Sequence, residues 1–151
     1  MNKVMIAAAI VTWSAAGCAV AQGNPITHLN VHDHASTGSD GYTDVAACDA
    51  TYSYKYSGGS GKGGDVTFTN RGPESVVLKL DNATPSDRRY TLNNVTFPID
   101  PHKQLSWHGS APTNGEIGDA NDVVQTASYK VLVNDTTAGC TVPCDPLIIN
   151  R

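Results

Sequence analysis

The sequence predicts one all-β domain, and three observations lead to this prediction. Short runs of alternating apolar and polar residues recur along the chain, clusters rich in Gly, Pro, Asn and Asp separate them, and no window after residue 21 keeps helical apolar spacing over three turns. Alternation with a period of two is typical of strands with one buried face. We therefore expect a β-sandwich of about seven to nine strands with an immunoglobulin-like or cupredoxin-like topology. A small closed β-barrel is the alternative, because strand number alone does not separate the two.

The first half of the domain contains the strongest strand signal. In Ala46–Tyr56 the even-numbered residues, three tyrosines among them, would share the face that turns to the core. A glycine-rich loop at 57–64 and a strand at Asp65–Asn70 follow, and we expect these two strands to form a hairpin. A strand at Ser75–Leu80 after turn residues would make three consecutive antiparallel strands.

The second half combines short strands with one long loop. We interpret Gly109–Asn121 as the polar loop and Val123–Val133 as the second strong strand. Pro98 and Pro101 confine any pairing near them to sheet edges. The other predicted strands are Ile26–Val31, Tyr90–Leu92, Val95–Phe97, Leu105–Trp107 and Leu147–Asn150.

The first 21 residues have the organisation of a bacterial-type cleavable signal peptide. Lys3 supplies the positive charge, Val4–Trp13 the apolar segment, and Ala19–Ala21 the small residues that a signal peptidase accepts. The apolar segment is shorter than the roughly 20 residues of a membrane-spanning helix. Cleavage after Ala21 would leave residues 22–151 as a single domain in the periplasm or outside the cell.

A lipoprotein is the alternative for this N-terminus. Ala15-Ala16-Gly17-Cys18 resembles the sequence at which bacterial lipoproteins are cut and acylated on the cysteine, although Ala15 stands where Leu, Val or Ile is usual. No other segment is apolar enough to be transmembrane, so an anchor would have to be a lipid on Cys18.

The charge of the chain argues against nucleic acid as a partner. The formal net charge is -4, and it becomes -5 when Lys3 leaves with the signal peptide. The sequence also contains no basic run or basic patch interleaved with aromatic residues, which binding to a phosphate backbone needs.

The mature chain would keep three cysteines, and an oxidising compartment favours one disulfide. Cys140 and Cys144 are close in sequence with prolines nearby, so we expect a local Cys140–Cys144 disulfide and a buried free Cys48. The alternative joins Cys48 to Cys140 or Cys144, and closing such a long loop would stabilise the fold more.

Three histidines near the mature N-terminus are candidate metal ligands. His28, His32 and His34 would share one face of a strand, and imidazoles so placed can bind copper or zinc. The competing interpretation is a solvated polar arm with no ligand. His102 and His108 lie far along the chain, and nothing in the sequence brings them together.

Signatures of common enzymes are missing from the sequence. It contains no Gly-x-Ser-x-Gly, no His-Glu-x-x-His and no complete P-loop. We therefore expect a secreted or periplasmic, non-enzymatic module without a cofactor that binds a macromolecule or surface ligand. The alternative is a periplasmic copper- or zinc-binding protein that uses the histidine arm, and an enzyme comes third.

Overall fold

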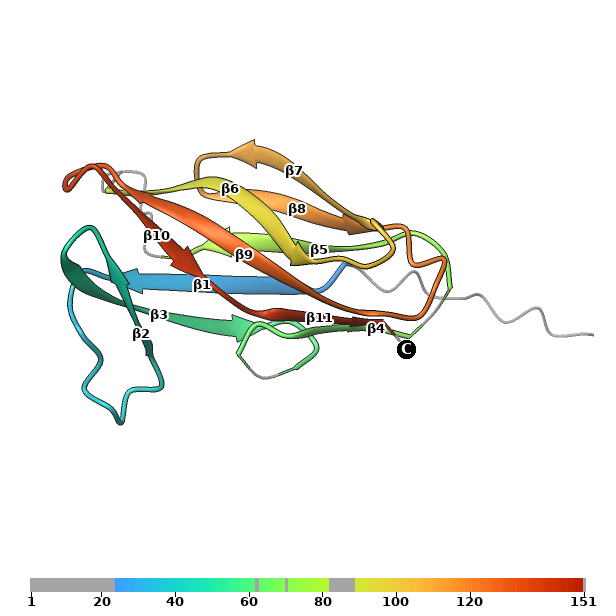
Figure 1. Ribbon diagram of the computed structural model, residues 1–151, viewed down its shortest axis with the longest axis horizontal. Helices are drawn as coiled ribbons and strands as arrows, with labels where there is room; N and C mark the ends of the chain where they lie inside the picture. The colour runs from blue at the N-terminus through green and yellow to red at the C-terminus, as the bar shows by residue number, and fades with distance from the viewer. Residues whose placement is uncertain (1–23, 62, 70, 82–88, 151) are drawn as a thin grey trace, which may run out of the picture.

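The computed structural model describes residues 24–61, 63–69, 71–81 and 89–150, so the predicted signal peptide and Cys18 lie outside the described residues. The described chain forms eleven strands in two sheets (Figure 1). They are β1 (Ile26–His32), β2 (Thr43–Ala47), β3 (Ala50–Gly58), β4 (Val66–Phe68), β5 (Glu74–Leu80), β6 (Tyr90–Ile99), β7 (Leu105–Ala111), β8 (Asn114–Asp119), β9 (Thr126–Asp135), β10 (Cys140–Cys144) and β11 (Leu147–Asn150). The predicted β-sandwich is confirmed, with more strands than expected.

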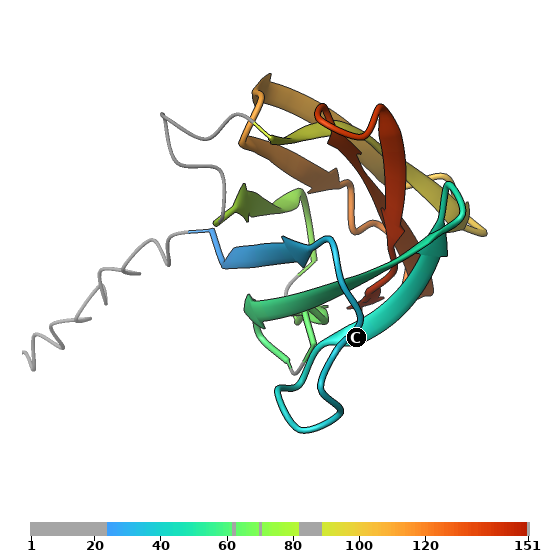
Figure 2. The same ribbon diagram turned by 90° about the vertical axis from the view of Figure 1, so that its left-hand side faces the viewer.

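The larger sheet has six strands in the order β2-β3-β1-β5-β8-β7. Its strand β1 is antiparallel to β3 and parallel to β5. The smaller sheet is built around β9, which pairs with β6 on one side and with β11 and β10 in turn on the other. Strand β4 lies parallel to β11. Figure 2 shows the two layers from the side, with the blue β1 in one and the red strands in the other.

The outermost strands of the six-stranded sheet settle the choice between sandwich and barrel. Within the described ranges, neither β2 nor β7 forms a ladder with the second sheet. The apolar core is therefore enclosed by two facing sheets rather than by one closed sheet.

The core consists of the inward residues of both sheets. The largest fully buried side chains are Tyr129, Leu29, Leu78, Ile117, Val31, Val66, Val76, Val131, Val133 and Val142. Full burial of one such side chain contributes roughly 1.5–3 kcal/mol. The alternation predicted for β5 and β9 is confirmed, because every second residue is buried from Val76 to Leu80 in β5 and throughout β9.

The prediction of a single strand at Ala46–Tyr56 is wrong. The chain turns at Cys48 and Asp49, which join β2 to β3 as a hairpin. Their φ angles are 49° and 62°, and a two-residue turn of type I′ needs positive φ at both positions. Asn-Gly or Asp-Gly is usual there, so Cys-Asp gave no turn signal. The tyrosines of β3 do face the core as predicted, since Tyr52 and Tyr56 are buried.

The predicted hairpin between this segment and Asp65–Asn70 does not form either. Strand β3 pairs with β1 and β2, whereas β4 belongs to the other sheet. The glycine-rich stretch permits this crossing: Gly64 has φ of 87°, and a Cβ there would lie 2.6 Å from the Tyr56 ring. Because β5 then returns to the first sheet beside β1, the expected run of three antiparallel neighbours is also wrong.

The predicted loop Gly109–Asn121 is in fact part of a hairpin. Strands β7 and β8 pair across it, with Gly109 opposite Gly115. A Cβ on Gly115 would overlap the Trp107 ring, so the indole covers a strand position that has no side chain. Glycines lower the strand propensity of this segment, and the covering tryptophan is not visible in a sequence pattern.

The strands of the smaller sheet also differ from the expected boundaries. Tyr90–Leu92 and Val95–Phe97 are parts of the one strand β6, which has irregular register at two places. Its position at the sheet edge agrees with the restriction that Pro98 imposes. Strand β9 begins at Thr126, so Val123 and Val124 precede it.

The predicted Cys140–Cys144 disulfide is wrong, and Cys48 is not the free cysteine. Cys48 is bonded to Cys140 with a Cα–Cα distance of 6.0 Å, and Cys144 is a buried free thiol. Cys140 and Cys144 are the two ends of the extended strand β10. Four residues of strand span about 13 Å, whereas a disulfide needs Cα atoms closer than about 7 Å.

The long-range disulfide should stabilise the fold strongly. It links residues 92 positions apart, and chain entropy assigns such a loop about 4–5 kcal/mol. We expect the double variant Cys48→Ala/Cys140→Ala to lose most of that free energy of unfolding in urea denaturation. Cys144→Ala is the matched control, because it keeps the disulfide and should lose less than half as much. A Cys140–Cys144 link in a non-reducing peptide map would contradict the assignment.

Candidate functional site

A groove of about 690 Å³ lies on the outer face of the six-stranded sheet, over β5, β8 and β7. Outward residues of neighbouring strands form its floor in rows, because the register places Ser75 beside Gly118 and Gly118 beside Ser106. The lining residues are Asn24, Pro73, Glu74, Ser75, Gln104, Ser106, His108, Glu116, Gly118, Asp119 and Ala120.

Gly118 contributes no side chain to the middle of this floor. A Cβ at this position would lie 2.8 Å from Ser106 Oγ, and the next nearest atoms would belong to the His108 ring, at 3.9 and 4.0 Å. The Ser106 hydroxyl therefore lies close over the backbone of β8 at this position. Close approach of this kind is typical of strand glycines.

The polar groups of the groove are partly engaged with one another. Asn24 Nδ2 donates to Ser75 Oγ at 2.7 Å, and His108 Nε2 lies 3.2 Å from Ser106 Oγ. Glu116 is directly opposite His108 in the β7–β8 ladder. These hydrogen bonds hold the side chains in place on a rigid sheet, which lowers the entropy cost of binding.

The groove carries negative charge. Its acidic lining residues are Glu116, which points outward, and Glu74 and Asp119, which lie opposite each other in the inward-facing rows of β5 and β8; neither Lys nor Arg is among the lining residues. Asn121 Nδ2 donates to Glu74 Oε2 at 3.2 Å, and the Asn121 N–H donates to Asp119 Oδ1 at 2.8 Å. The groove therefore fits a ligand group that is cationic or rich in hydrogen-bond donors.

A network around the buried Gln104 supports one end of the groove. Its Oε1 accepts from the N–H groups of Asp122 and Val123, at 2.5 and 3.0 Å, and its Nε2 donates to Val123 O at 2.8 Å. Asp100 accepts from the N–H groups of Gln104 and Leu105, at 3.1 and 3.0 Å. The two loops at this end are thus tied together beneath the groove.

This groove was not predicted from the sequence. Glu116 and Gly118 lie in the segment that we predicted as a loop, so their common face with Ser106 was not recognised. The alternation of Gly115, Ile117 and Asp119 was the available signal, because these residues turn inward.

The three predicted metal ligands are brought only partly together. β1 is a paired strand inside the sheet rather than a free arm. His28 and His32 stand four residues apart on it, which is about 13 Å, and His28 Nδ1 lies 2.6 Å from Asp81 Oδ1. Only His32 and His34 are neighbours, with ring centroids 4.9 Å apart. In the described part of the chain no group of three or more His, Cys, Asp or Glu could hold one ion.

The stacking of these two rings limits what they can bind as they stand. Their planes differ by 17°, and the His32 ring also stacks on Tyr42 at 4.4 Å. Imidazole lone pairs lie in the ring plane, so nearly parallel stacked rings do not point at one ion. One ring would have to rotate before both could ligate it.

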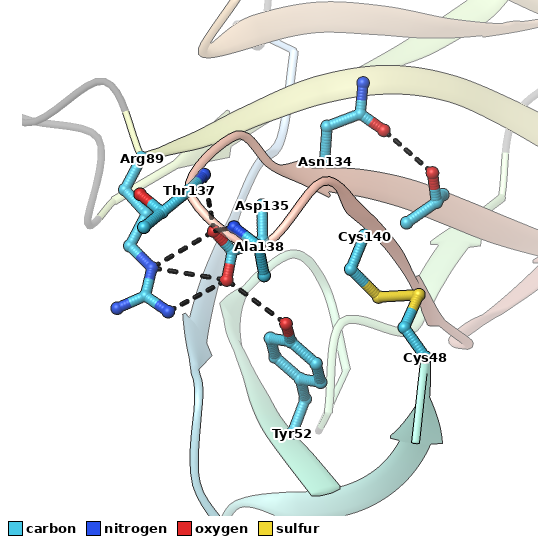
Figure 3. Close-up of a disulfide and its surroundings, with 9 residues drawn as sticks. Cys48, Tyr52, Arg89, Asn134, Asp135, Thr137, Ala138 and Cys140 are labelled. Atoms are coloured by element: carbon cyan, nitrogen blue, oxygen red, sulfur yellow. Dashed lines mark hydrogen bonds and ion pairs between the residues drawn. A yellow bond between two sulfur atoms is a disulfide. The ribbon is translucent and has the colours of Figure 1, made fainter. Parts of the chain in front are cut away.

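A second polar cluster joins the two sheets beside the disulfide (Figure 3). The Asp135 carboxylate at the end of β9 is fully shielded from solvent and accepts hydrogen bonds from Arg89 Nη2 at 2.9 Å and from Tyr52 Oη at 3.2 Å. The N–H groups of Thr137 and Ala138 also donate to it. Because every contact is internal, we assign this cluster to stability rather than to binding.

Comparison with known proteins adds little to this description. No protein-family model matches the chain, and no curated protein sequence matches it. Among solved structures, the chain is similar to the cysteine protease inhibitor EhICP2 from Entamoeba histolytica at 18% identity, with a TM-score of 0.32 and coverage of 56% of this chain and 84% of that chain. A likeness at this level carries no conclusion about function, so the interpretation of the groove rests on its own residues.

The Asp135 cluster should make the fold sensitive to acid. Burial raises the pKa of this carboxyl, but the hydrogen bonds from Arg89, Ala138, Thr137 and Tyr52 outweigh it and leave the pKa below its ordinary value. A lowered folded-state pKa stabilises the protein above the unfolded-state value of about 3.9, and this stability is lost as the pH falls through the folded-state pKa.

We expect Asp135→Asn to lose roughly 2–3 kcal/mol of unfolding free energy near pH 7, since Arg89 is 29% exposed and keeps its ion pair with Asp33. The variant should also flatten the loss of stability below about pH 4. Urea denaturation between pH 2 and 7 measures both effects. Asp49→Asn is the control, because it removes an exposed carboxylate in the β2–β3 turn; an equal flattening in that variant would contradict the assignment.

Proposed function

We propose that this protein is an exported, non-enzymatic binding module that uses the groove over β5, β8 and β7 to hold a cationic group of a macromolecular ligand. The observation that carries the proposal is the groove itself: a floor without a side chain at Gly118, two flanking serines, and acidic residues without a basic one among the lining residues. Such a preorganised surface on a rigid sheet favours binding.

The disulfide and the absence of a spanning helix fit the exported part of the proposal. Disulfides persist in oxidising compartments, so Cys48–Cys140 is compatible with a periplasmic or extracellular location. None of the described residues forms a helix long and apolar enough to cross a membrane.

The contact between Ser106 and His108 in the groove resembles part of an enzyme active site. The geometry of this contact nevertheless favours binding over catalysis. Ser106 and His108 resemble a nucleophile and its base, at 3.2 Å. A base of this kind needs a third group that orients it, and within the described residues no ion pair joins His108 to Glu116. The pair also lies on an exposed strand, where water has free access.

The binding proposal can be tested with a short poly-L-lysine as the cationic probe. We expect backbone amide shifts in NMR spectra at Ser75, Ser106, His108 and Gly118, and none with poly-L-glutamate. The double variant Glu74→Gln/Glu116→Gln should weaken binding at least severalfold, because the attraction between the opposite charges is removed. Asp49→Asn serves as the control for the loss of a distant carboxylate.

Two outcomes would contradict the proposal. Shifts spread over the whole surface, or unchanged in the Glu74→Gln/Glu116→Gln variant, would remove the groove as the binding surface. Hydrolysis of p-nitrophenyl acetate that Ser106→Ala abolishes would replace the binding module with an esterase.

A second candidate function is binding of Cu(II) or Zn(II) by His32 and His34, which the closeness of their rings favours. We expect binding to be lost in His34→Ala, because the variant removes one of the two imidazole ligands. Titration calorimetry measures it. No affinity tighter than about 10 μM, or one unchanged in His34→Ala, would exclude this function.

A further inference from the structure

A second hollow lies on the outer face of the smaller sheet, on the opposite side of the sandwich from the groove. Asn93 from β6, Asn134 from β9 and Thr141 from β10 line it, together with the turn between β9 and β10. Its volume is about 370 Å³, which falls within the range of roughly 300–1,000 Å³ that small-molecule sites occupy.

The alternation along β9 and β10 determines which side chains reach this hollow. Val133 is fully buried, so its neighbour Asn134 turns outward, and Thr141 directly opposite Asn134 does the same. Asp135 and Cys140 also line the hollow, but the Asp135 carboxylate is fully shielded and the Cys140 sulfur belongs to the disulfide. The accessible side chains among the lining residues are therefore uncharged.

A β-bulge in β6 adds an amide to the hollow. Leu92 faces Val133 and Asn94 faces Leu132 in the β6–β9 ladder, so Asn93 is the extra residue between them. Asn93 is exposed, as is Asn94. Bulges redirect side chains and are frequent beside functional sites, and this bulge places Asn93 next to the end of β9.

The amides of Asn93 and Asn134 keep hydrogen-bonding groups for a ligand. Asn134 Oδ1 accepts from Thr141 Oγ1 at 2.9 Å, and in Figure 3 the nitrogen of this amide points away from the disulfide. Within the ranges that the structure describes, neither Asn134 Nδ2 nor the Asn93 side chain has a hydrogen-bond partner in the protein. An amide supplies both donors and an acceptor, so the pair suits a ligand with both kinds of group.

The turn beside these amides is held in place before any ligand binds. The N–H groups of Thr137 and Ala138 donate to the Asp135 carboxylate at 3.0 and 3.1 Å. The Cys48–Cys140 disulfide fixes the start of β10. Such preorganisation lowers the entropy cost of binding. The cluster that stabilises the fold therefore also supports the hollow above it.

The lining chemistry favours one class of ligand. An ion would lose its water without meeting an opposite charge, because the Asp135 carboxylate is already bonded to Arg89. An apolar group would leave the amides of Asn93 and Asn134 unpaired, which is unfavourable. A neutral saccharide carries neighbouring hydroxyl groups, each of which is a donor and an acceptor, and avoids both costs.

We propose that the hollow between the β6 bulge and the β9–β10 turn binds the hydroxyl groups of a neutral saccharide. The amides of Asn93 and Asn134 contact the ligand. Thr141 is a positioning residue, because its hydroxyl holds the Asn134 amide. This site lies on the other sheet from the acidic groove and does not depend on the proposed function.

The probes are three neutral trisaccharides, maltotriose, cellotriose and chitotriose, each titrated into the protein and followed by NMR. We expect the side-chain NH₂ signals of Asn93 and Asn134 to shift with at least one of them. A few exposed hydrogen bonds predict a dissociation constant on the order of 1 mM. The backbone signals of Ser75 and Gly118 in the groove should not move.

The direct contact is tested at Asn93. Asn93→Ala removes one amide and should weaken binding roughly three- to tenfold, the range for one net hydrogen bond. Thr96→Ala is the matched control, because Thr96 is exposed on the same strand but does not line the hollow. Its affinity should stay within about twofold of that of the wild type.

The positioning role of Thr141 is tested by a change of chemistry at constant shape. Thr141→Val keeps the branched side chain but removes the hydroxyl that holds Asn134, and it should weaken binding severalfold. Thr141→Ser keeps the hydroxyl and should restore the affinity. Thr141 is exposed, so neither change alters the core.

Three outcomes would overturn the proposal. The first is no side-chain shift with any of the trisaccharides at about 10 mM, well above the expected dissociation constant. The second is equal affinity of Asn93→Ala and Thr96→Ala. The third is a shift of Asn93 and Asn134 with poly-L-lysine or poly-L-glutamate alone, which would indicate a charged polymer as the ligand. None of the three would remove the acidic groove as a binding surface.

Discussion

The alternation of inward and outward residues along β5, β8 and β7 is the constraint on which the groove depends. Ile117 turns inward and is fully buried, so its neighbours Glu116 and Gly118 must turn outward. A shift of the register by one residue would place a carboxylate in the core and an isoleucine in the groove. The burial of a few apolar side chains therefore determines the chemistry of the opposite face of the sheet.

The same constraint explains why the fold class was predictable. Period-two runs such as Leu78-Lys79-Leu80 and Tyr129-Lys130-Val131 carry the burial signal within a few residues. Because this signal is local, it can be recognised in the sequence without knowledge of which strands pair. The class of the fold and the inward faces of the long strands followed from it.

Strand partners could not be predicted, because they depend on contacts between distant residues. β1 pairs with β5, and β4 pairs with β11, and no local pattern records either choice. The turn at Cys48-Asp49 lacks the usual residues, so a hairpin resembled one strand. The disulfide was missed for the same reason, since sequence proximity of Cys140 and Cys144 counts against a bond once both lie on one extended strand.

The groove was missed because strand β8 contains two glycines, of which Gly115 is covered by the Trp107 indole and Gly118 lies against Ser106. Gly115 and Gly118 lower the strand propensity of β8, and their value lies in contacts with β7. The missed residues are thus those at which local propensity and tertiary packing disagree. Such disagreement is expected at functional positions more than in the core.

The pairing of β1 with β5 has a consequence for how the protein folds. Between these two strands the chain builds β2 and β3 in the same sheet and β4 in the other. Strand β4 in turn pairs with β11, whose residues come about 80 positions later. The smaller sheet therefore cannot close before the chain has reached residue 150, and non-local pairing of this kind makes folding slow. Until then the unpaired strands remain exposed, and this kinetic delay rather than the final stability sets the period in which the chain can aggregate.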